Sequence, residues 1–264
     1  MYKVVGFPWN HSICFVLGFI TQNHSQVDKL WSLLPPTYCF IVVLLAPFHP
    51  RVLLMNTLAW MWGIRLTYNF VRRGGYTWSG EDYRWPIIRK FVNNRFLFEI
   101  FDLFFIAIFQ NFLLLFIASP IFYVAYHRTV PLNLWDLVCT LLFFFFFIIE
   151  VTADQQQWNF HADKAAKRRG TQAGFLQTGL FRYCRHPNFF AECCIWWAFY
   201  GFTLSVQPFS YLNWTIFGTI ALTCLINSST VLTESISAGK YPKYKQYQQT
   251  TSRLLPWFPS NKIY

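Results

Sequence analysis

Charged residues are scarce in this 264-residue chain, at 12% of the sequence. Soluble proteins carry about 25% charged residues, so the scarcity argues against one large soluble domain or two small ones. Glycine and proline are too few and too irregularly spaced for a collagenous chain, and the apolar content excludes intrinsic disorder. The seven Cys residues show neither metal-ligand spacing nor a disulfide framework, which is typical of reduced thiols in a membrane protein.

Apolar and aromatic residues are correspondingly abundant. They make up 55% and 22% of the chain, with 31 Phe and 12 Trp, and the mean hydropathy is +0.29. This composition predicts an all-α polytopic membrane protein, with residues 1–264 forming a single membrane-embedded domain.

Seven apolar stretches are of a length that fits a helix crossing the bilayer. They are residues 3–20, 31–47, 51–71, 98–125, 133–153, 188–206 and 211–232. The first contains Pro8, Asn10 and His11 and lacks a basic leading region, so we expect a retained helix and no cleaved signal peptide.

The basic residues report the orientation of these spans. With seven crossings, the segments 21–30, 72–97, 154–187 and 233–264 share one side and hold eighteen of the 22 Lys and Arg residues, whereas the opposite side holds three. The positive-inside rule then predicts an outside N-terminus and a cytosolic C-terminus. The net charge of +11 is thereby explained by orientation and by attraction to anionic membrane lipids, and we expect no nucleic-acid partner.

Polar residues gather in three clusters at the ends of these spans. The first places Arg65, Tyr68, Asn69 and Arg72 within two turns of one helix, which Gly74-Gly75 should end before the segment E-D-Y-R-W at 81–85.

The second cluster lies on a helix that leaves the membrane, where Glu150, Asp154 and Gln157 are aligned. The third spans residues 179–192, where Pro187 suits the first turn of a helix. Such a helix start favours an anion such as a phosphate, and Arg182, Arg185 and His186 precede it.

The motif R-H-P-N-F-F-A-E at 185–192 resembles the C-terminal signature of the steroid 5α-reductase superfamily, in a branch of unknown function. The resemblance extends to S-Q-V-D-K-L-W at 25–31, W-G-I-R-L at 62–66, E-D-Y-R-W, A-D-Q-Q at 153–156 and the tail 241–257, and so covers nearly the whole chain. It implies seven transmembrane helices around a cytosol-facing NADPH site.

The resemblance also implies a reaction, the NADPH-dependent reduction of a carbon–carbon double bond conjugated to a carbonyl in a lipid-like substrate. In the family a Glu that follows a Gln, together with a Tyr, holds the carbonyl oxygen. Asp28 and Gln26 fall near the first pattern. Trp62 stands where the family has its Tyr, so Tyr68, nearly two turns along the same helix, is the substitute we expect.

Burial near Leu30 and Trp31 should raise the pKa of Asp28 and keep its carboxyl protonated. The structural alternative is that Asp28 pairs with Lys29 or caps the following helix.

The resemblance implies that Glu150, Asp154, Tyr183, Asn188 and Glu192 occupy cofactor-binding positions of the family. Arg72, Arg84 and Arg185 are expected at the phosphates, because a guanidinium binds a phosphate with two hydrogen bonds. The full set is Arg65, Asn69, Arg72, Asp82, Arg84, Glu150, Asp154, Gln157, Tyr183, Arg185, His186, Asn188, Glu192 and Glu234. No Rossmann G-x-G-x-x-G follows a strand, so helices and loops would hold the nucleotide. We expect no metal site.

Two other functions remain open. Membrane methyltransferases of the isoprenylcysteine and phospholipid type carry a similar R-H-P element and bind S-adenosylmethionine. Alternatively, a relative without turnover could be a structural subunit of a membrane protein complex, which the departures at Asp28, Trp62 and Ala191 keep open. The sequence names neither the substrate, the oligomeric state nor the membrane; the endoplasmic reticulum is the family default and the mitochondrial inner membrane the alternative.

Overall fold

The computed structural model describes residues 9–46, 49–78, 80–127, 130–168, 170–207 and 212–260. Parts of the predicted spans, residues 3–8, 47 and 211, lie outside these ranges. The chain divides into two compact units, which we describe separately. Unit 1 comprises Met1–Pro131 with Leu212–Gly218, and unit 2 comprises Leu132–Tyr211 with Thr219–Tyr264.

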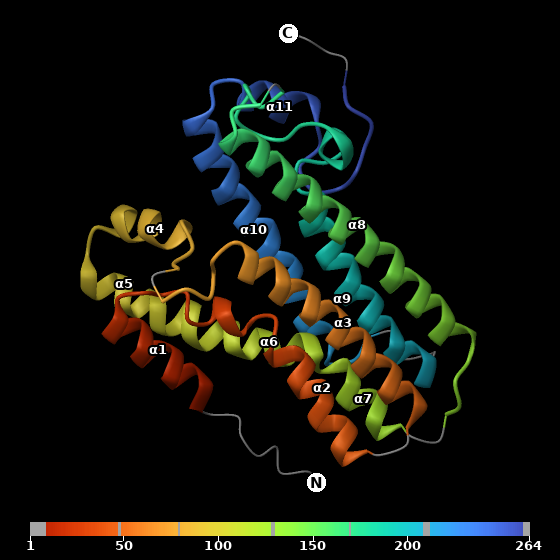
Figure 1. The fold of residues 1–264 in the computed structure, drawn as a ribbon. Helices are drawn as coiled ribbons and strands as arrows, with labels where there is room; N and C mark the ends of the chain where they lie inside the picture. The colour runs from red at the N-terminus through yellow and green to blue at the C-terminus, as the bar shows by residue number, and fades with distance from the viewer. Residues whose placement is uncertain are drawn as a thin grey trace. The chain divides into compact units, whose positions relative to one another are not determined.

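Every regular element in the described ranges is helical (Figure 1). Unit 1 contains α1 (Trp9–Thr21), η1 (Asp28–Leu30), α2 (Leu34–Leu45), α3 (Pro50–Arg72), α4 (Arg84–Val92), α5 (Arg95–Phe101), η2 (Asp102–Phe109), α6 (Gln110–Ala118) and α7 (Pro120–Tyr126). Unit 2 contains α8 (Leu134–Ala165), η3 (Gly179–Arg182), α9 (Pro187–Val206), most of α10 (Ile216–Lys240) and α11 (Tyr244–Thr250). The all-α class predicted from composition is therefore confirmed for these residues.

Four helical stretches are long and apolar enough to cross a membrane: Arg95–Ala118, α8, α9 and α10. Helices also cover the other three predicted segments, but α1 and α2 have only 13 and 12 residues. The third, α3, has 23 residues but carries Arg51, Arg65 and Asn69 among its apolar side chains. The protein is thus a membrane protein with four helices of spanning length and composition in the described ranges.

In unit 1, α2 packs against α3 and α6. Gly63 permits the close approach of α2 and α3, because a Cβ atom there would lie 2.6 Å from Pro36 Cγ and from the Ser32 carbonyl oxygen. Arg51 is 1% exposed and donates to the carbonyl oxygens of Val130 and Pro131 at 2.9 and 2.7 Å, so its buried guanidinium is hydrogen-bonded.

The predicted single span 98–125 is wrong in detail. The chain passes from α5 through the π-helical η2 into α6, and the helix is interrupted at Ser119 because Pro120 starts α7. Proline has no N–H to continue the preceding helix, so the break follows from its chemistry.

In unit 2, α8 packs along α9 over most of its length. Asn133 and Asp136 form a capping box at the start of α8, and Asp136 also accepts from Ser205 Oγ of α9 at 2.7 Å. The 32 residues of α8 correspond to about 48 Å, longer than a hydrocarbon core of about 30 Å. Its polar C-terminal turns therefore extend beyond the membrane.

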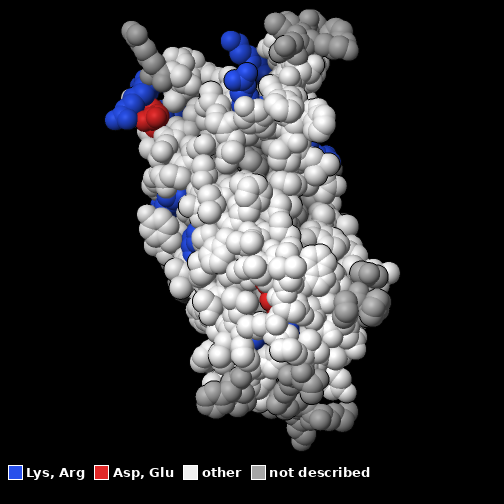
Figure 2. Space-filling view, turned by 90° about the vertical axis from the view of Figure 1, so that its right-hand side faces the viewer, with Lys and Arg blue, Asp and Glu red and all other residues white. Residues whose placement is uncertain are grey.

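The outer surface of α8 is apolar. Its exposed large side chains include Leu134, Leu137, Leu141, Phe145 and Ile148. Most of the face drawn in Figure 2 likewise carries neither basic nor acidic residues. Lipid contact accounts for such a surface.

Candidate functional site

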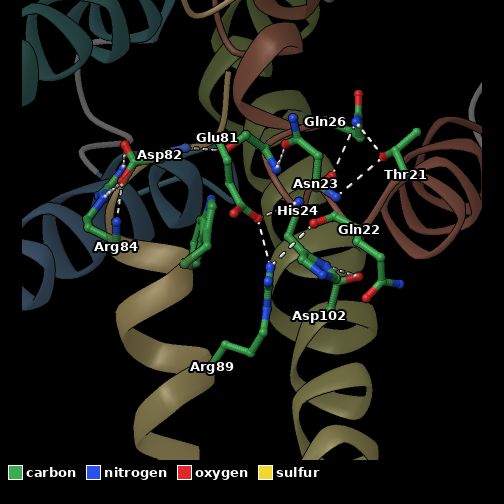
Figure 3. A network of polar contacts seen from close by, with 12 residues as sticks. Thr21, Gln22, Asn23, His24, Gln26, Glu81, Asp82, Arg84, Arg89 and Asp102 are labelled. Atoms are coloured by element: carbon green, nitrogen blue, oxygen red, sulfur yellow. Dashed lines mark hydrogen bonds and ion pairs between the residues drawn. The ribbon is translucent and has the colours of Figure 1, made fainter. Parts of the chain in front are cut away.

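Each unit contains one network of polar side chains. In unit 1 the network joins residues 23–28, which follow α1 and reach the start of η1, to residues 80–85, which lead into the first turn of α4 (Figure 3). Asn23 Nδ2 donates to the carbonyl oxygens of Trp78 and Gly80 at 3.2 and 3.1 Å. The Asp82 backbone N–H donates to Ser25 Oγ at 2.8 Å. These contacts fix one loop against the other.

Two predicted cofactor residues of this network bind each other. Arg84 Nε and Nη2 donate to the two oxygens of the Asp82 carboxylate at 2.8 and 3.0 Å. Both side chains are 27% exposed. The Arg84 guanidinium also lies 5.7 Å above the Trp85 ring. A phosphate contact by Arg84 would therefore compete with Asp82.

Asp28 is the first residue of η1, and it is half-buried. Its Oδ2 accepts a hydrogen bond from Trp85 Nε1 at 3.0 Å. Removal of the carboxyl from water raises the pKa of Asp28, against the opposing effects of Arg84 and of the Trp85 hydrogen bond. The direction agrees with the sequence expectation. Neither structural alternative is seen in the described residues, since the Lys29 ammonium contacts Gln26 and the cap position of η1 is Val27.

The structure does not bring the other predicted catalytic residues to Asp28. Gln26 turns back on its own loop, where Nε2 donates to Thr21 Oγ1 and the Asn23 carbonyl at 3.3 and 3.2 Å. Tyr68 is 63% exposed, with the Arg72 guanidinium 5.3 Å above its ring. Within the described chain its hydroxyl makes no hydrogen bond. The catalytic roles of Gln26 and Tyr68 stay predictions.

Arg65, Asn69 and Arg72 all lie on α3, as their spacing predicted. Asn69 is buried and the two arginines are half-buried. The helix ends at Arg72, and Gly74 follows in a left-handed conformation with φ +76°. The glycine pair therefore ends the helix as expected.

Sequence reasoning missed a buried acid–imidazole pair. His24 Nδ1 lies 3.1 Å from Asp102 Oδ2, and the two side chains are 1% and 4% exposed. The His24 backbone N–H donates to Glu81 Oε1 at 3.1 Å, and Arg89 Nη2 donates to the same oxygen at 2.8 Å. Asp102 begins η2, far from His24 in the chain, so no local pattern signals the pair.

In unit 2 the second and third predicted clusters meet on facing helices. Asn188 Nδ2 of α9 donates to Asp154 Oδ1 of α8 at 3.2 Å. Glu150, Asp154 and Glu192 are 4%, 6% and 9% exposed, and Glu192 accepts from Trp196 Nε1 at 2.9 Å. The α8–α9 packing thus brings residues predicted from separate motifs together.

Arg185 is held by the chain around it. Its Nε and Nη2 donate to the two carboxylate oxygens of Glu234 at 2.6 and 2.9 Å, and Nη1 donates to the carbonyl oxygens of Gln248, at 2.9 Å, and Thr251. His186 Nε2 and Gln248 Nε2 reach the same carboxylate at 3.0 and 2.9 Å. All three guanidinium nitrogens are therefore used within unit 2, which leaves Arg185 poorly suited to a phosphate.

The C-terminal segment closes over this cluster. The Trp257 backbone N–H donates to the Tyr183 carbonyl at 2.9 Å, and Tyr247 donates its hydroxyl to the Phe181 carbonyl. Burial raises the pKa of Tyr247, which keeps this donor protonated.

Two further predicted cofactor residues lie in unit 2. Tyr183 is 41% exposed. Gln157 interacts with His161 one turn along α8, at 3.3 Å between Nε2 atoms.

In the described residues no group of three or more His, Cys, Asp or Glu side chains could hold a metal ion.

Comparison with known proteins places the chain in a family. A family model described as a protein of unknown function (DUF1295) matches residues 14–251, a range that includes residues of both units. An uncharacterized protein of Schizosaccharomyces pombe is 37% identical over 270 residues, which cover 92% of this chain and 78% of that protein. No solved structure matches the chain. The extent of the family match and this identity show that the chain belongs to the DUF1295 family.

Proposed function

We propose that the protein uses NADPH to reduce a carbon–carbon double bond conjugated to a carbonyl in a lipid-like substrate. The motifs that resemble the steroid 5α-reductase superfamily motivate the proposal. The observation that carries it is the half-buried amide of Asn188, which donates to the buried carboxylate of Asp154. Among the described residues the amide makes that single hydrogen bond, although an amide can make about four. The pair is therefore suited to a polar ligand group.

The residues around this pair fit the polar parts of the cofactor. Asn188 and Asp154 would bind a carboxamide or ribose hydroxyls, with Glu150 and Glu192 nearby on the same two helices. Arg182, exposed on η3, makes no hydrogen bond or ion pair within the described chain. It replaces Arg185 as the cation that would meet a phosphate, near the start of α9.

The chemistry of the reduction divides between cofactor and protein. NADPH, when bound, supplies a hydride to the β carbon of the enone. The protein has to stabilise the negative charge that develops on the carbonyl oxygen, which requires a hydrogen-bond donor in a poorly solvated site. Asp28, with its raised pKa, suits that role in its neutral form.

The proposal includes seven membrane crossings, with the N-terminus outside, the C-terminus cytosolic and the endoplasmic reticulum as the membrane. The seven helix-covered apolar segments and the distribution of basic residues support it. Protection of a C-terminal tag from protease in intact microsomes would contradict this orientation.

Binding of NADPH to the purified protein in detergent tests the cofactor assignment. Asp154→Ala and Asn188→Ala should each weaken binding at least several-fold, because each loses a hydrogen bond worth about 1 kcal/mol. Asn159→Ala, an exposed polar position on the same helix, should leave affinity unchanged.

Two results would remove the assignment. One is an unchanged NADPH affinity in both variants. The other is binding of S-adenosylmethionine in place of NADPH, which would favour the methyltransferase.

A further inference from the structure

Trp85 restricts how the Asp28 carboxyl can carry a proton. The indole is 5% exposed, and its N–H donates to Asp28 Oδ2 at 3.0 Å. An indole N–H can only donate. The oxygen that faces Trp85 therefore acts as an acceptor in either protonation state of the carboxyl. In the neutral carboxyl the carbonyl oxygen is a better acceptor than the hydroxyl oxygen, so the contact favours the carbonyl form of Oδ2.

The other groups near Asp28 impose no such choice. The Ser25 hydroxyl, whose influence lowers the pKa of the carboxyl, can rotate to donate or to accept. Asp82, from the loop before α4, and Arg84, the first residue of α4, act on the carboxyl through charge. Trp85 is thus the group in the described residues that distinguishes the two carboxyl oxygens.

Contacts around the indole hold its N–H in place. The Trp85 backbone N–H donates to the Asp82 carbonyl at 3.1 Å, and the guanidinium of Arg84, fixed by Asp82, lies over the ring. The E-D-Y-R-W segment therefore supplies a rigid donor, and the η1 turn presents Asp28 to it.

We propose that Trp85 is a positioning residue that fixes Oδ2 of Asp28 as the acceptor, so that the proton of the neutral carboxyl resides on Oδ1. Which oxygen accepts is set by the geometry of the Trp85 contact, and the raised pKa of Asp28 supports the neutral form of its carboxyl. Its consequence for catalysis, that the Oδ1 hydroxyl is the donor to the substrate carbonyl, rests on the proposed function. Asp28 would donate a hydrogen bond from a single oxygen in a single direction, which is how preorganised donors lower a barrier.

Infrared spectroscopy of the purified protein in D₂O tests the proton placement. The spectrum of the parent minus that of Asp28→Asn should show a protonated-carboxyl band at neutral pH. In Trp85→Phe this band should move to higher wavenumber, because the carbonyl oxygen of the acid loses its donor. Trp31→Phe is the matched control: its indole donates to Gln110 Oε1 at 2.9 Å, and its loss should leave the Asp28 band in place.

The outcomes separate the inference from the proposed function. An ionised Asp28 at neutral pH in the parent protein would overturn the proton placement. A carboxyl band that stays at the same wavenumber in Trp85→Phe would also overturn it. With an enone substrate, Trp85→Phe should lower kcat by up to about a hundredfold, the scale of a misplaced catalytic group, with KM and NADPH affinity nearly unchanged. A moved band with full kcat would leave the placement standing and refute its catalytic consequence. A moved band with no enone reduction even in the parent would refute the proposed function alone.

Discussion

Two carboxyl groups, one in each unit, are held in opposite ways. Glu234 is 5% exposed and accepts hydrogen bonds from Arg185, His186 and Gln248. Asp28 has a neutral indole as its close donor, and Arg84, the cation that lowers its pKa, is bound to another carboxylate. The first carboxyl is neutralised by a permanent cation, whereas the second has no such compensation at hydrogen-bonding distance among the described residues.

The difference separates a structural role from a chemical one. A buried carboxylate with a bidentate arginine keeps its charge. The C-terminal segment is held by hydrogen bonds to this pair, from Gln248 to Glu234 and from Arg185 to the Thr251 carbonyl. A desolvated carboxyl that meets only neutral donors takes up a proton at a lower energetic cost. Three variants test this comparison.

The largest effect is expected when the Glu234 cluster is broken. Glu234→Ala leaves the buried guanidinium of Arg185, whose side chain is 8% exposed, without its counter-charge. Removal of one partner of a buried pair costs about 3–5 kcal/mol, so the free energy of unfolding in detergent should fall by that amount. Denaturant titration of the purified variant measures it.

The control is an ion pair of the same chemistry on the surface of unit 2. Arg168 Nη1 lies 2.8 Å from Asp163 Oδ1, with side chains 71% and 42% exposed. Asp163→Ala should cost at most about 1 kcal/mol. Equal losses in the two variants would show that Glu234 contributes no more than a solvated pair.

Local chemistry explains what could be predicted from the sequence. Pro187 suits the first turn of α9 because its ring fixes φ, and Gly74 ends α3 because glycine adopts the left-handed conformation without strain. The described parts of the apolar segments are largely helical, because a helix satisfies its own backbone hydrogen bonds in an apolar environment. The π-helical turn of η2 has no such local marker, and it went unpredicted.

The pairing of side chains depends on packing, and sequence reasoning therefore failed there. The hydrogen-bond partner of Asp28 is Trp85, from the first turn of α4, and no local pattern around Asp28 signals it. We expected Arg185 to bind a phosphate because its motif precedes a helix start. In the structure its guanidinium instead forms an ion pair with Glu234 of α10. Asp154 and Asn188 do meet, since the register of α8 against α9 agrees with the family-based assignment.

An intermediate effect is expected from Asp28→Asn, and its sign depends on pH. A carboxyl whose pKa is raised in the folded protein loses its proton first in the unfolded chain, so its contribution to stability falls as pH rises above the unfolded value of 3.8. Asparagine does not titrate. The variant should therefore gain stability relative to the parent as pH increases from there towards the folded pKa, in denaturant titrations at a series of pH values. A constant difference between the two proteins would mean that the pKa of Asp28 is the same folded and unfolded.

The smallest effect is expected from Arg84→Gln. Arg84 opposes the raised pKa of Asp28 by charge, whereas Asp82 adds to it, so loss of the cation should raise the pKa of Asp28 further. Both side chains are 27% exposed, and solvent screening keeps the change small. The pH at which the Asp28 carboxyl band disappears should thus move upward, whereas its wavenumber should stay where Trp85 holds it. A shift in wavenumber without a shift in titration would show that Arg84 acts on Asp28 by holding the indole in position, and the distinction between charge and geometry drawn for this carboxyl would then be wrong.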